Sequence, residues 1–167
     1  DRGLRVELRG IRVSLPDDLH GADDAGIVTV LAAGNERQQG GIVRFASSAI
    51  VVAAGDINGQ FATFSNPAAT NSILSTAAPG VNIVSARPGG GYVTMSGTSM
   101  ATPFVAGVVA AMQSERVAMG LPRLKNADFK RLFGSRNVDA GRPGADTDFG
   151  PGLLDGELLK LSLTPMP

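Results

Sequence analysis

Apolar positions along this chain fall into short runs that are separated by turns rich in Gly, Pro and Asn. The runs 27–31 and 50–54 are continuously apolar or β-branched, which is typical of parallel strands buried on both faces. Residues 4–15 instead alternate apolar and polar side chains around Gly10, and this alternation predicts a half-buried strand. The first third of the chain is therefore expected to be rich in strands.

The rest of the chain combines two further strands with helices. Residues 81–85 and 92–95 are strand-like, and the Gly-rich turn 88–91 joins them. A long helix is predicted from Val105 to Met119 and a second one from Asn126 to Phe133. This alternation predicts an α/β fold, with a doubly wound, mostly parallel sheet that carries helices on both faces. A last short helix is expected at the end of the chain.

Composition changes this picture little, but it excludes several functions. A chain of 167 residues that is 43% apolar suits one domain with a sizeable core. The formal net charge is zero and there is no basic block, which argues against a nucleic acid as the main partner. The absence of Cys excludes a disulfide framework, a thiolate metal site and a Cys nucleophile. No apolar run approaches the roughly 18 residues of a membrane-spanning helix.

Ser99 lies at the junction between the strand 92–95 and the long helix. The first backbone N–H groups of a helix have no partner within it and carry the positive end of the helix dipole. Such donors can hold the oxyanion that forms when a serine attacks a carbonyl group. Gly97 allows close approach of the backbone, and Pro103 is expected in the first turn. For a lone serine, the ordinary explanation of such a position is a helix cap.

A second candidate residue, Asn35, follows the predicted strand 27–31. Sites in open α/β sheets collect at the carboxyl ends of strands, so this side-chain amide is well placed to donate to the same oxyanion. Taken alone, an asparagine after Gly34 is readily explained as a turn residue. The combination of Asn35 with Ser99 favours a catalytic site.

The sequence around both residues resembles the subtilisin-like serine proteases, or subtilases. Residues 97–107 resemble the nucleophile segment of that family, and residues 30–36 resemble the strand end that carries its oxyanion asparagine. Weaker motifs at 61–66 and 77–80 follow in the family's order. The resemblance therefore extends over residues 27–112, in order and spacing as well as in single motifs.

This resemblance implies a role for each matching residue. Ser99 would attack a peptide carbonyl group, and the Asn35 side chain with the Ser99 N–H would stabilise the tetrahedral intermediates. Ala33 and Gly34 would form part of one wall of the primary specificity pocket. Ser14 and Leu15 would end the strand that pairs with the substrate.

The resemblance also reveals what this sequence lacks. Subtilases use Asp, His and Ser in that order, and a serine needs such a base to become a good nucleophile. No segment resembles the Asp or His motifs, so residues 1–167 are expected to be the C-terminal portion of one subtilase-like catalytic domain. An N-terminal fragment or chain of the same protease would supply both side chains, and this chain alone would be nearly inactive. The start at Asp1 instead of Met agrees with a cleavage product or a trimmed piece.

His20 is the single histidine of the chain, and the pair His20-Gly21 loosely resembles the family's His-Gly pair. The residues that follow do not continue that pattern, and His20 lies close in sequence to the strand before Asn35. A surface histidine is therefore the expected interpretation. The α/β-hydrolases also place a serine at a strand-to-helix turn, but their histidine follows the nucleophile. No histidine follows Ser99, which excludes that alternative.

Departures from the family pattern concern the substrate pocket more than the fold. Pro16 and Asp17 stand where subtilases usually have glycines, and Phe104 replaces a frequent histidine outside the triad. No cofactor is evident, and the paired aspartates at Asp17 and Asp23 are expected on a solvated face. Calcium is possible by family resemblance alone, with no ligand set to name. The resemblance also favours an extracellular or periplasmic location.

Three functional hypotheses remain open. The first is a serine endopeptidase that is active when assembled with the segment carrying Asp and His. The second is a non-catalytic, subtilase-like pseudoenzyme that acts as a binding or regulatory module, with Ser99 as a helix cap. The third is a structural truncation, in which the strands 27–31 and 50–54 lose neighbours and expose apolar surface.

Overall fold

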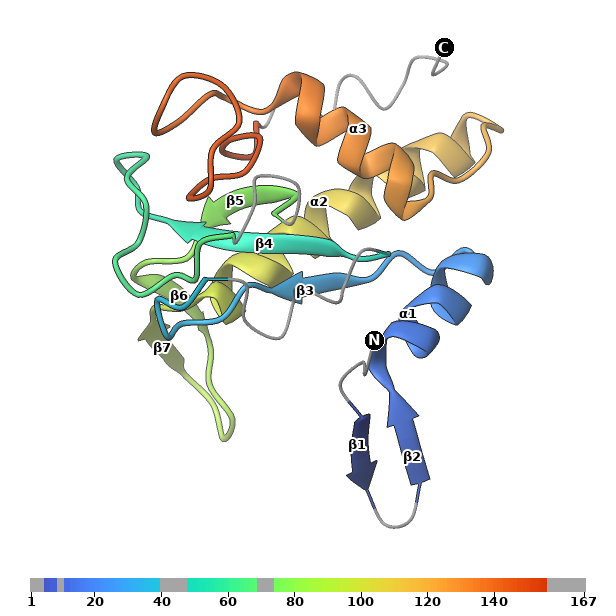
Figure 1. The fold of residues 1–167 in the computed structure, drawn as a ribbon, viewed down its shortest axis with the longest axis horizontal. Coiled ribbons are helices and arrows are strands. Elements are labelled where there is room, and N and C mark those ends of the chain that lie inside the picture. Colours follow the sequence, from blue (N-terminus) through green and yellow to red (C-terminus); the bar gives the residue numbers. More distant parts are fainter. Residues whose placement is uncertain (1–4, 9–10, 40–47, 69–73, 156–167) are drawn as a thin grey trace.

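The computed structural model describes residues 5–8, 11–39, 48–68 and 74–155, and Figure 1 shows their arrangement. In chain order, the elements are β1 (Arg5–Leu8), β2 (Ile11–Ser14), α1 (Leu15–Asp24), β3 (Val30–Ala32), β4 (Ile50–Gly55), β5 (Thr76–Pro79), β6 (Ile83–Ala86), β7 (Tyr92–Met95), α2 (Thr98–Ala118) and α3 (Asn126–Arg136). The last short helix expected from the sequence falls outside the described residues. None of the described helices combines the length and the apolar character that a membrane span needs.

The strands β3, β4 and β5 form a parallel sheet with β4 in the middle. All six residues of β4 are buried, as the apolar run 50–54 predicts. β3 is shorter than the predicted strand 27–31, and its residues are only half-buried. The predicted burial on both faces is therefore not found for β3, which among the described residues pairs with β4 alone. A strand with one neighbour leaves its other edge open.

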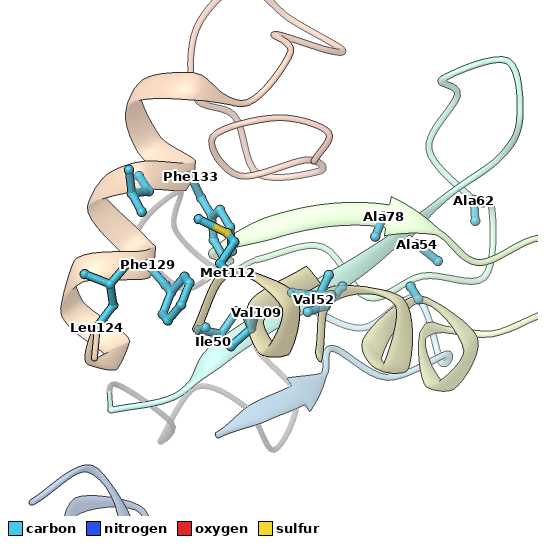
Figure 2. Close-up of a cluster of buried hydrophobic side chains, with 13 residues drawn as sticks. Ile50, Val52, Ala54, Ala62, Ala78, Val109, Met112, Leu124, Phe129 and Phe133 are labelled. Atoms are coloured by element: carbon cyan, nitrogen blue, oxygen red, sulfur yellow. The ribbon is translucent and has the colours of Figure 1, made fainter. Parts of the chain in front are cut away.

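One face of β4 packs against α2 and α3. Ile50 and Val52 point to this face, because alternate residues of a strand point the same way. Figure 2 shows them in one cluster with Met112 of α2 and with Phe129 and Phe133 of α3, all fully buried. Removing each such large side chain from water contributes roughly 1.5–3 kcal/mol. This layer fixes α2, and with it the strand-to-helix junction at Ser99, onto the sheet.

The opposite face of β4 is covered by α1 and by loops. Val51 and Ala53 belong to a second buried cluster that includes Leu19 of α1. Phe149, from the loop after α3, joins the same cluster and meets Phe61 edge to face, with 5.4 Å between the ring centroids. Helices therefore lie on both faces of a parallel sheet. The predicted α/β fold class is confirmed.

Two antiparallel hairpins complete the described fold. β6 pairs with β7, and their turn contains Gly89, Gly90 and Gly91 with positive φ angles, which glycine adopts without strain. β7 then leads directly into α2. The predicted strand 4–15 is two strands, β1 and β2, which pair with each other. Figure 1 shows this second hairpin beside α1 and apart from the parallel sheet.

The helix α2 begins earlier than the sequence predicts. It starts at Thr98 with Gly97 as its N-cap, whereas the apolar run predicts a start near Val105. Pro103 therefore lies inside the helix, beyond the expected first turn. A proline lacks the N–H that would bond to the carbonyl four residues back, which here belongs to Ser99.

The helix α3 is tied to α1 through Asn126. The helix begins at Asn126, as the sequence predicts, and Lys125 is its N-cap. The buried Asn126 side chain accepts a hydrogen bond from the Thr29 N–H at 3.2 Å and donates one to Asp23 Oδ1 at 2.9 Å. These bonds join the end of α1, the segment before β3 and the start of α3.

Candidate active site

The N-terminus of α2 presents Ser99 at the surface. Thr98, the first residue of the helix, is fully buried, whereas Ser99 is exposed. The N–H of Met100 is already bonded to the Gly97 carbonyl at 3.0 Å. The Ser99 N–H has no hydrogen-bond partner in the part of the chain that the structure describes, as is usual in the first turn of a helix. It is therefore available to an incoming acceptor.

Asn35 meets the start of this helix directly. Its Oδ1 accepts hydrogen bonds from the Thr98 N–H at 2.8 Å and from the Thr98 hydroxyl at 3.0 Å. The same hydroxyl accepts a bond from the Gly34 N–H at 3.1 Å. Because both acceptor positions of Oδ1 are used, the orientation of the whole amide group is set by Thr98.

The nitrogen of this amide remains a free donor. No partner for Asn35 Nδ2 occurs among the described residues, and the side chain is exposed. A Cβ placed on Gly97 would lie 3.5 Å from this Nδ2, so the nitrogen lies close to the backbone just before the helix. The structure thus brings Asn35 and the Ser99 segment together at the carboxyl edge of the sheet.

The two predicted pocket residues occupy the loop between β3 and Asn35. Ala33 is buried, and its N–H bonds to the Val52 carbonyl at 2.9 Å. Gly34 has a φ of 102°, a left-handed conformation that favours glycine. Both therefore lie beside Asn35, and their role in binding substrate stays a prediction.

Ser14 and Leu15 lie elsewhere in this structure. Ser14 ends β2 and Leu15 begins α1. β2 pairs antiparallel with β1, and Figure 1 shows this hairpin apart from the sheet that carries Asn35. The structure does not bring these two residues to Ser99. Their predicted role at the end of a substrate-binding strand stays a prediction.

His20 lies on the exposed surface of α1. Its Nδ1 is 2.5 Å from the Ser48 hydroxyl. Because Ser48 comes just before the amino end of β4, this histidine lies at the opposite end of the strands from Asn35 and Ser99. The structure therefore agrees with a surface histidine.

A carboxylate borders the candidate site on the side of Asn35. Glu36 Oε2 accepts a hydrogen bond from the Asn35 N–H at 3.0 Å, and Glu36 is exposed.

At the other end of the sheet, burial lowers the pKa of Lys130, an effect that nearby Asp23 opposes. No three His, Cys, Asp or Glu side chains of the described ranges gather as metal ligands.

Two further residues, Thr98 and Asn66, shape this site, and the sequence pattern alone does not reveal their roles. Thr98 bonds to a residue 63 positions away, and buried Asn66 bonds to Ala33, which is 33 positions away. The sequence indicates them only through their positions in the family-like motifs 61–66 and 97–107. A local pattern cannot show which distant group a polar side chain will meet.

The pattern of the subtilase family matches residues 11–152, which is most of the chain. The chain belongs to the subtilase family. This confirms the resemblance drawn from residues 97–107 and 30–36, and it agrees with the parallel sheet and the strand-to-helix serine.

Two curated subtilases show how much of such a protein is present. Subtilisin-like protease 3 of Arthroderma benhamiae is 45% identical over 108 residues, which are 62% of this chain and 26% of that protein. Thermostable alkaline protease of Halalkalibacterium halodurans is 49% identical over 96 residues, which are 56% of this chain and 25% of that protein. The chain thus matches about a quarter of the length of these relatives.

Solved protease structures share the fold over nearly the whole chain. The self-cleaved protease domain of PatA has a TM-score of 0.74 and 26% identity, covering 96% of this chain and 58% of that one. A structure of the patellamide maturation protease PatA has a TM-score of 0.73 and 27% identity, covering 96% and 59%. This chain therefore spans about three-fifths of these protease structures.

Proposed function

We propose that this chain carries the nucleophile and the oxyanion hole of a serine endopeptidase. The observation that supports this best is the pair of bonds from Thr98 to Asn35 Oδ1. They leave the Asn35 amide donors unpaired beside the start of the helix that carries Ser99. Two donors, Asn35 Nδ2 and the Ser99 N–H, would then face the oxyanion of a tetrahedral intermediate.

The reaction proceeds through an acyl-enzyme. Ser99 Oγ attacks the peptide carbonyl carbon while its proton passes to a base, and the oxyanion forms. The C–N bond then breaks, and the leaving amine takes up that proton. Water, deprotonated by the same base, attacks the ester and releases the acid and Ser99. This chemistry needs no cofactor.

The base and its orienting carboxylate come from an N-terminal fragment or chain of the same protease. His20 is bonded to Ser48 at the other edge of the sheet, which disfavours it as the base for Ser99. In this proposal, residues 1–167 are the C-terminal portion of one catalytic domain. Without the missing portion, turnover falls by about 10⁶, the scale known for removal of a triad residue from a subtilisin.

The outer face of α2 supports such a docked segment. Residues 103–112 contain no polar side chain, yet Gly107, Ala110 and Ala111 are exposed and Phe104 is 51% exposed. A helix that is apolar all round is normally buried, whereas a surface helix has a polar outer face. Apart from its neighbours and the nearby backbone of its own helix, no atom of the described residues lies within 4 Å of a Cβ built on Gly107. A segment could therefore approach this helix closely.

An open groove continues this surface toward the C-terminal end of α2. It has a volume of 480 Å³ and lies between Val28, which precedes β3, and α2 residues such as Val109 and Val117. The adjacent edge of β3 is unpaired among the described residues. We assign the groove and the outer face of α2 to one occupant, the segment that carries Asp and His.

The remaining expectations follow from the same proposal. Ala33 and Gly34 line one wall of the specificity pocket, and Ser14 and Leu15 contribute to substrate binding once the catalytic domain is complete. The substrate is a peptide or protein. The location is extracellular or periplasmic. Calcium stays possible by family resemblance alone.

Intact mass spectrometry of the native protein, before and after treatment with a fluorophosphonate, tests the proposal. We expect a second polypeptide beside the 17.1 kDa chain, and one probe adduct on Ser99. The matched control is Ser99→Ala, in which the adduct should disappear while the second polypeptide remains bound. A single 17.1 kDa chain that takes up no probe would contradict the proposal.

A second candidate function is a non-catalytic binding or regulatory module. The observation that favours it is that His20, the single histidine of this chain, bonds to Ser48 at the amino end of the sheet. In that case Ser99→Ala leaves the biological activity intact. Loss of that activity together with loss of the probe adduct would exclude this alternative.

A further inference from the structure

The oxyanion asparagine proposed above lies on a loop that has no regular secondary structure. The loop follows β3, and its backbone contains left-handed conformations at Gly34, with a φ of 102°, and at Arg37, with a φ of 53°. Asn35 itself is exposed. An exposed side chain on such a loop needs additional contacts if its donors are to keep one direction.

Asn66 supplies these contacts from a buried position. This residue is 3% exposed. Its Oδ1 accepts hydrogen bonds from the Glu36 N–H and the Gln38 N–H, both at 2.9 Å. Its Nδ2 donates to the Ala33 carbonyl at 3.0 Å and to Glu36 Oε2 at 3.0 Å. Its own N–H donates to the Gly34 carbonyl at 2.9 Å.

These bonds surround Asn35 in the sequence without involving its side chain. Asn66 holds the loop immediately before Asn35, at the Ala33 and Gly34 carbonyls, and immediately after it, at the Glu36 N–H. All four hydrogen-bonding positions of the Asn66 amide group are used. Every hydrogen bond of the Asn66 side chain is therefore made to this loop.

Glu36 extends the contact to Asn35 itself. Its Oε2 accepts one bond from Asn66 Nδ2 and one from the Asn35 N–H, both at 3.0 Å. Asn35 is thus held at its backbone through Glu36 and at its side-chain oxygen through Thr98. The nitrogen Nδ2 is the part of its side chain that the described contacts leave free.

Close packing at Gly34 agrees with this arrangement. A Cβ on Gly34 would lie within 2.8 Å of Glu36 Oε2 and closer still to Asn66 Nδ2. A glycine at this position therefore lets the Asn66 amide approach the loop. Both the left-handed φ of this position and the close contact with Asn66 therefore favour glycine.

We propose that Asn66 is a positioning residue that orients Asn35 for the oxyanion. The proposal rests on the function proposed above, in which Asn35 Nδ2 is an oxyanion donor. A donor contributes most when it is already oriented before charge develops, because no reorganisation then accompanies the reaction. Asn66 touches neither the substrate nor Ser99, so it acts through the loop and through Asn35.

The first experiment compares Asn66→Ala with Asn137→Ala. Asn137 is a matched control, because its Nδ2 also makes two bonds, to Thr76 Oγ1 at 2.8 Å and to the Gly152 carbonyl at 3.0 Å, but it belongs to another loop. Kinetics on the complete protease should show that Asn66→Ala lowers kcat about 10- to 100-fold with little change in KM. Asn137→Ala should leave kcat per active site nearly unchanged. A cleaving Asn66→Ala variant with an unaltered kcat would overturn the proposal.

The second experiment needs no activity and therefore separates the two proposals. The Thr98 N–H bonds to Asn35 Oδ1 and makes no contact with Asn66. If Asn66 orients Asn35, Asn66→Ala should accelerate hydrogen exchange of the Thr98 amide at least several-fold, whereas Asn137→Ala should not. An unchanged Thr98 exchange rate would overturn the positioning role even in a protein that cleaves peptides. Failure of the unaltered protein to cleave would instead count against the proposed function.

Glu36→Ala provides a variant that keeps the buried Asn66. Glu36 is exposed, so its removal should leave the fold intact while breaking the link from Asn66 to the Asn35 N–H. We expect the same acceleration of Thr98 exchange, smaller in size. If Asn66→Ala fails to fold and Glu36→Ala leaves the Thr98 exchange rate unchanged, the proposal is also overturned.

Discussion

One asparagine lies at the amino edge of the parallel sheet, where its strands begin, and another lies at the carboxyl edge, where they end. The two side chains make different contacts. At the amino edge, Asn126 is 1% exposed, and both ends of its amide are bonded, to the Thr29 N–H and to Asp23 Oδ1. At the carboxyl edge, Asn35 is exposed, and the described contacts engage the oxygen of its side chain but not the nitrogen.

This difference separates a structural asparagine from a functional one. A buried amide must find partners for its donors and acceptors, because unsatisfied polar groups are costly to bury. An exposed amide has no such requirement, so a fixed oxygen beside a free nitrogen means that the fold orients a donor toward solvent. We therefore expect substitutions at the carboxyl edge to affect turnover and those at the amino edge to affect stability.

The largest effect is expected from Asn35→Ala. Loss of one oxyanion donor should lower kcat of the complete protease about 10²- to 10³-fold, a scale established on a protease of this family. The free energy of unfolding should change little, because the Asn35 side chain is exposed and water can replace its oxygen as the acceptor for the Thr98 N–H and hydroxyl. Steady-state kinetics and urea unfolding of the same samples provide the measurement. The exposed turn residue Asn58 offers a control, as Asn58→Ala should alter neither quantity.

A drop in stability with an unaltered kcat after Asn35→Ala would contradict the distinction between a functional Asn35 and a structural Asn126. The asparagine would then hold the loop to α2 without serving the reaction. Ser99 would still be the nucleophile, with its own N–H as the oxyanion donor supplied by this chain.

Asn126→Ala should show the opposite behaviour. It removes the acceptor of the Thr29 N–H and a donor to Asp23, both at a buried position. We expect the free energy of unfolding to fall by about 1–3 kcal/mol, with kcat per active site unchanged. Urea unfolding gives the first quantity, and turnover normalised by fluorophosphonate titration gives the second. An altered kcat per active site would show that the two edges are coupled.

The smallest effect is expected from Lys130→Met at the amino edge. Burial lowers the pKa of Lys130 below its ordinary value of 10.5, and the nearby Asp23 opposes this shift. At a pH below the lowered pKa, the lysine is charged in both the folded and the unfolded protein. Folding then carries the full cost of burying that charge. The cost disappears as the pH rises from the folded pKa toward 10.5. The variant should therefore be more stable than the unaltered protein at neutral pH.

This stability difference should shrink as the pH approaches 10.5, and thermal unfolding at several pH values measures it. Lys125→Met is the control, because Lys125 is exposed and its removal should give a small difference with no such trend. A stability difference at Lys130 that does not depend on pH would mean that the attraction of Asp23 offsets the burial of the charge.

The elements themselves follow closely from local sequence. The apolar run 50–54 predicts β4, and residues 92–95 are found as β7 without change of bounds. Both signals are local, because side-chain periodicity and β-branching act on neighbouring residues. The start of α2 was predicted too late, since Thr98 and Ser99 are not apolar and the Thr98 N–H finds its partner at Asn35, 63 positions away in the sequence.

By itself, the sequence determined the family, the α/β class and the two residues on which the proposed chemistry depends, Ser99 and Asn35. The tertiary structure decided how they are held. Thr98 fixes the Asn35 oxygen, and Asn66 holds the loop around it. It also revealed that His20 faces Ser48 at the other edge of the sheet and that α2 has an apolar outer face. The physical reason is that a hydrogen bond between residues 30 to 100 positions apart depends on packing of the whole sheet, which no local pattern of side chains encodes.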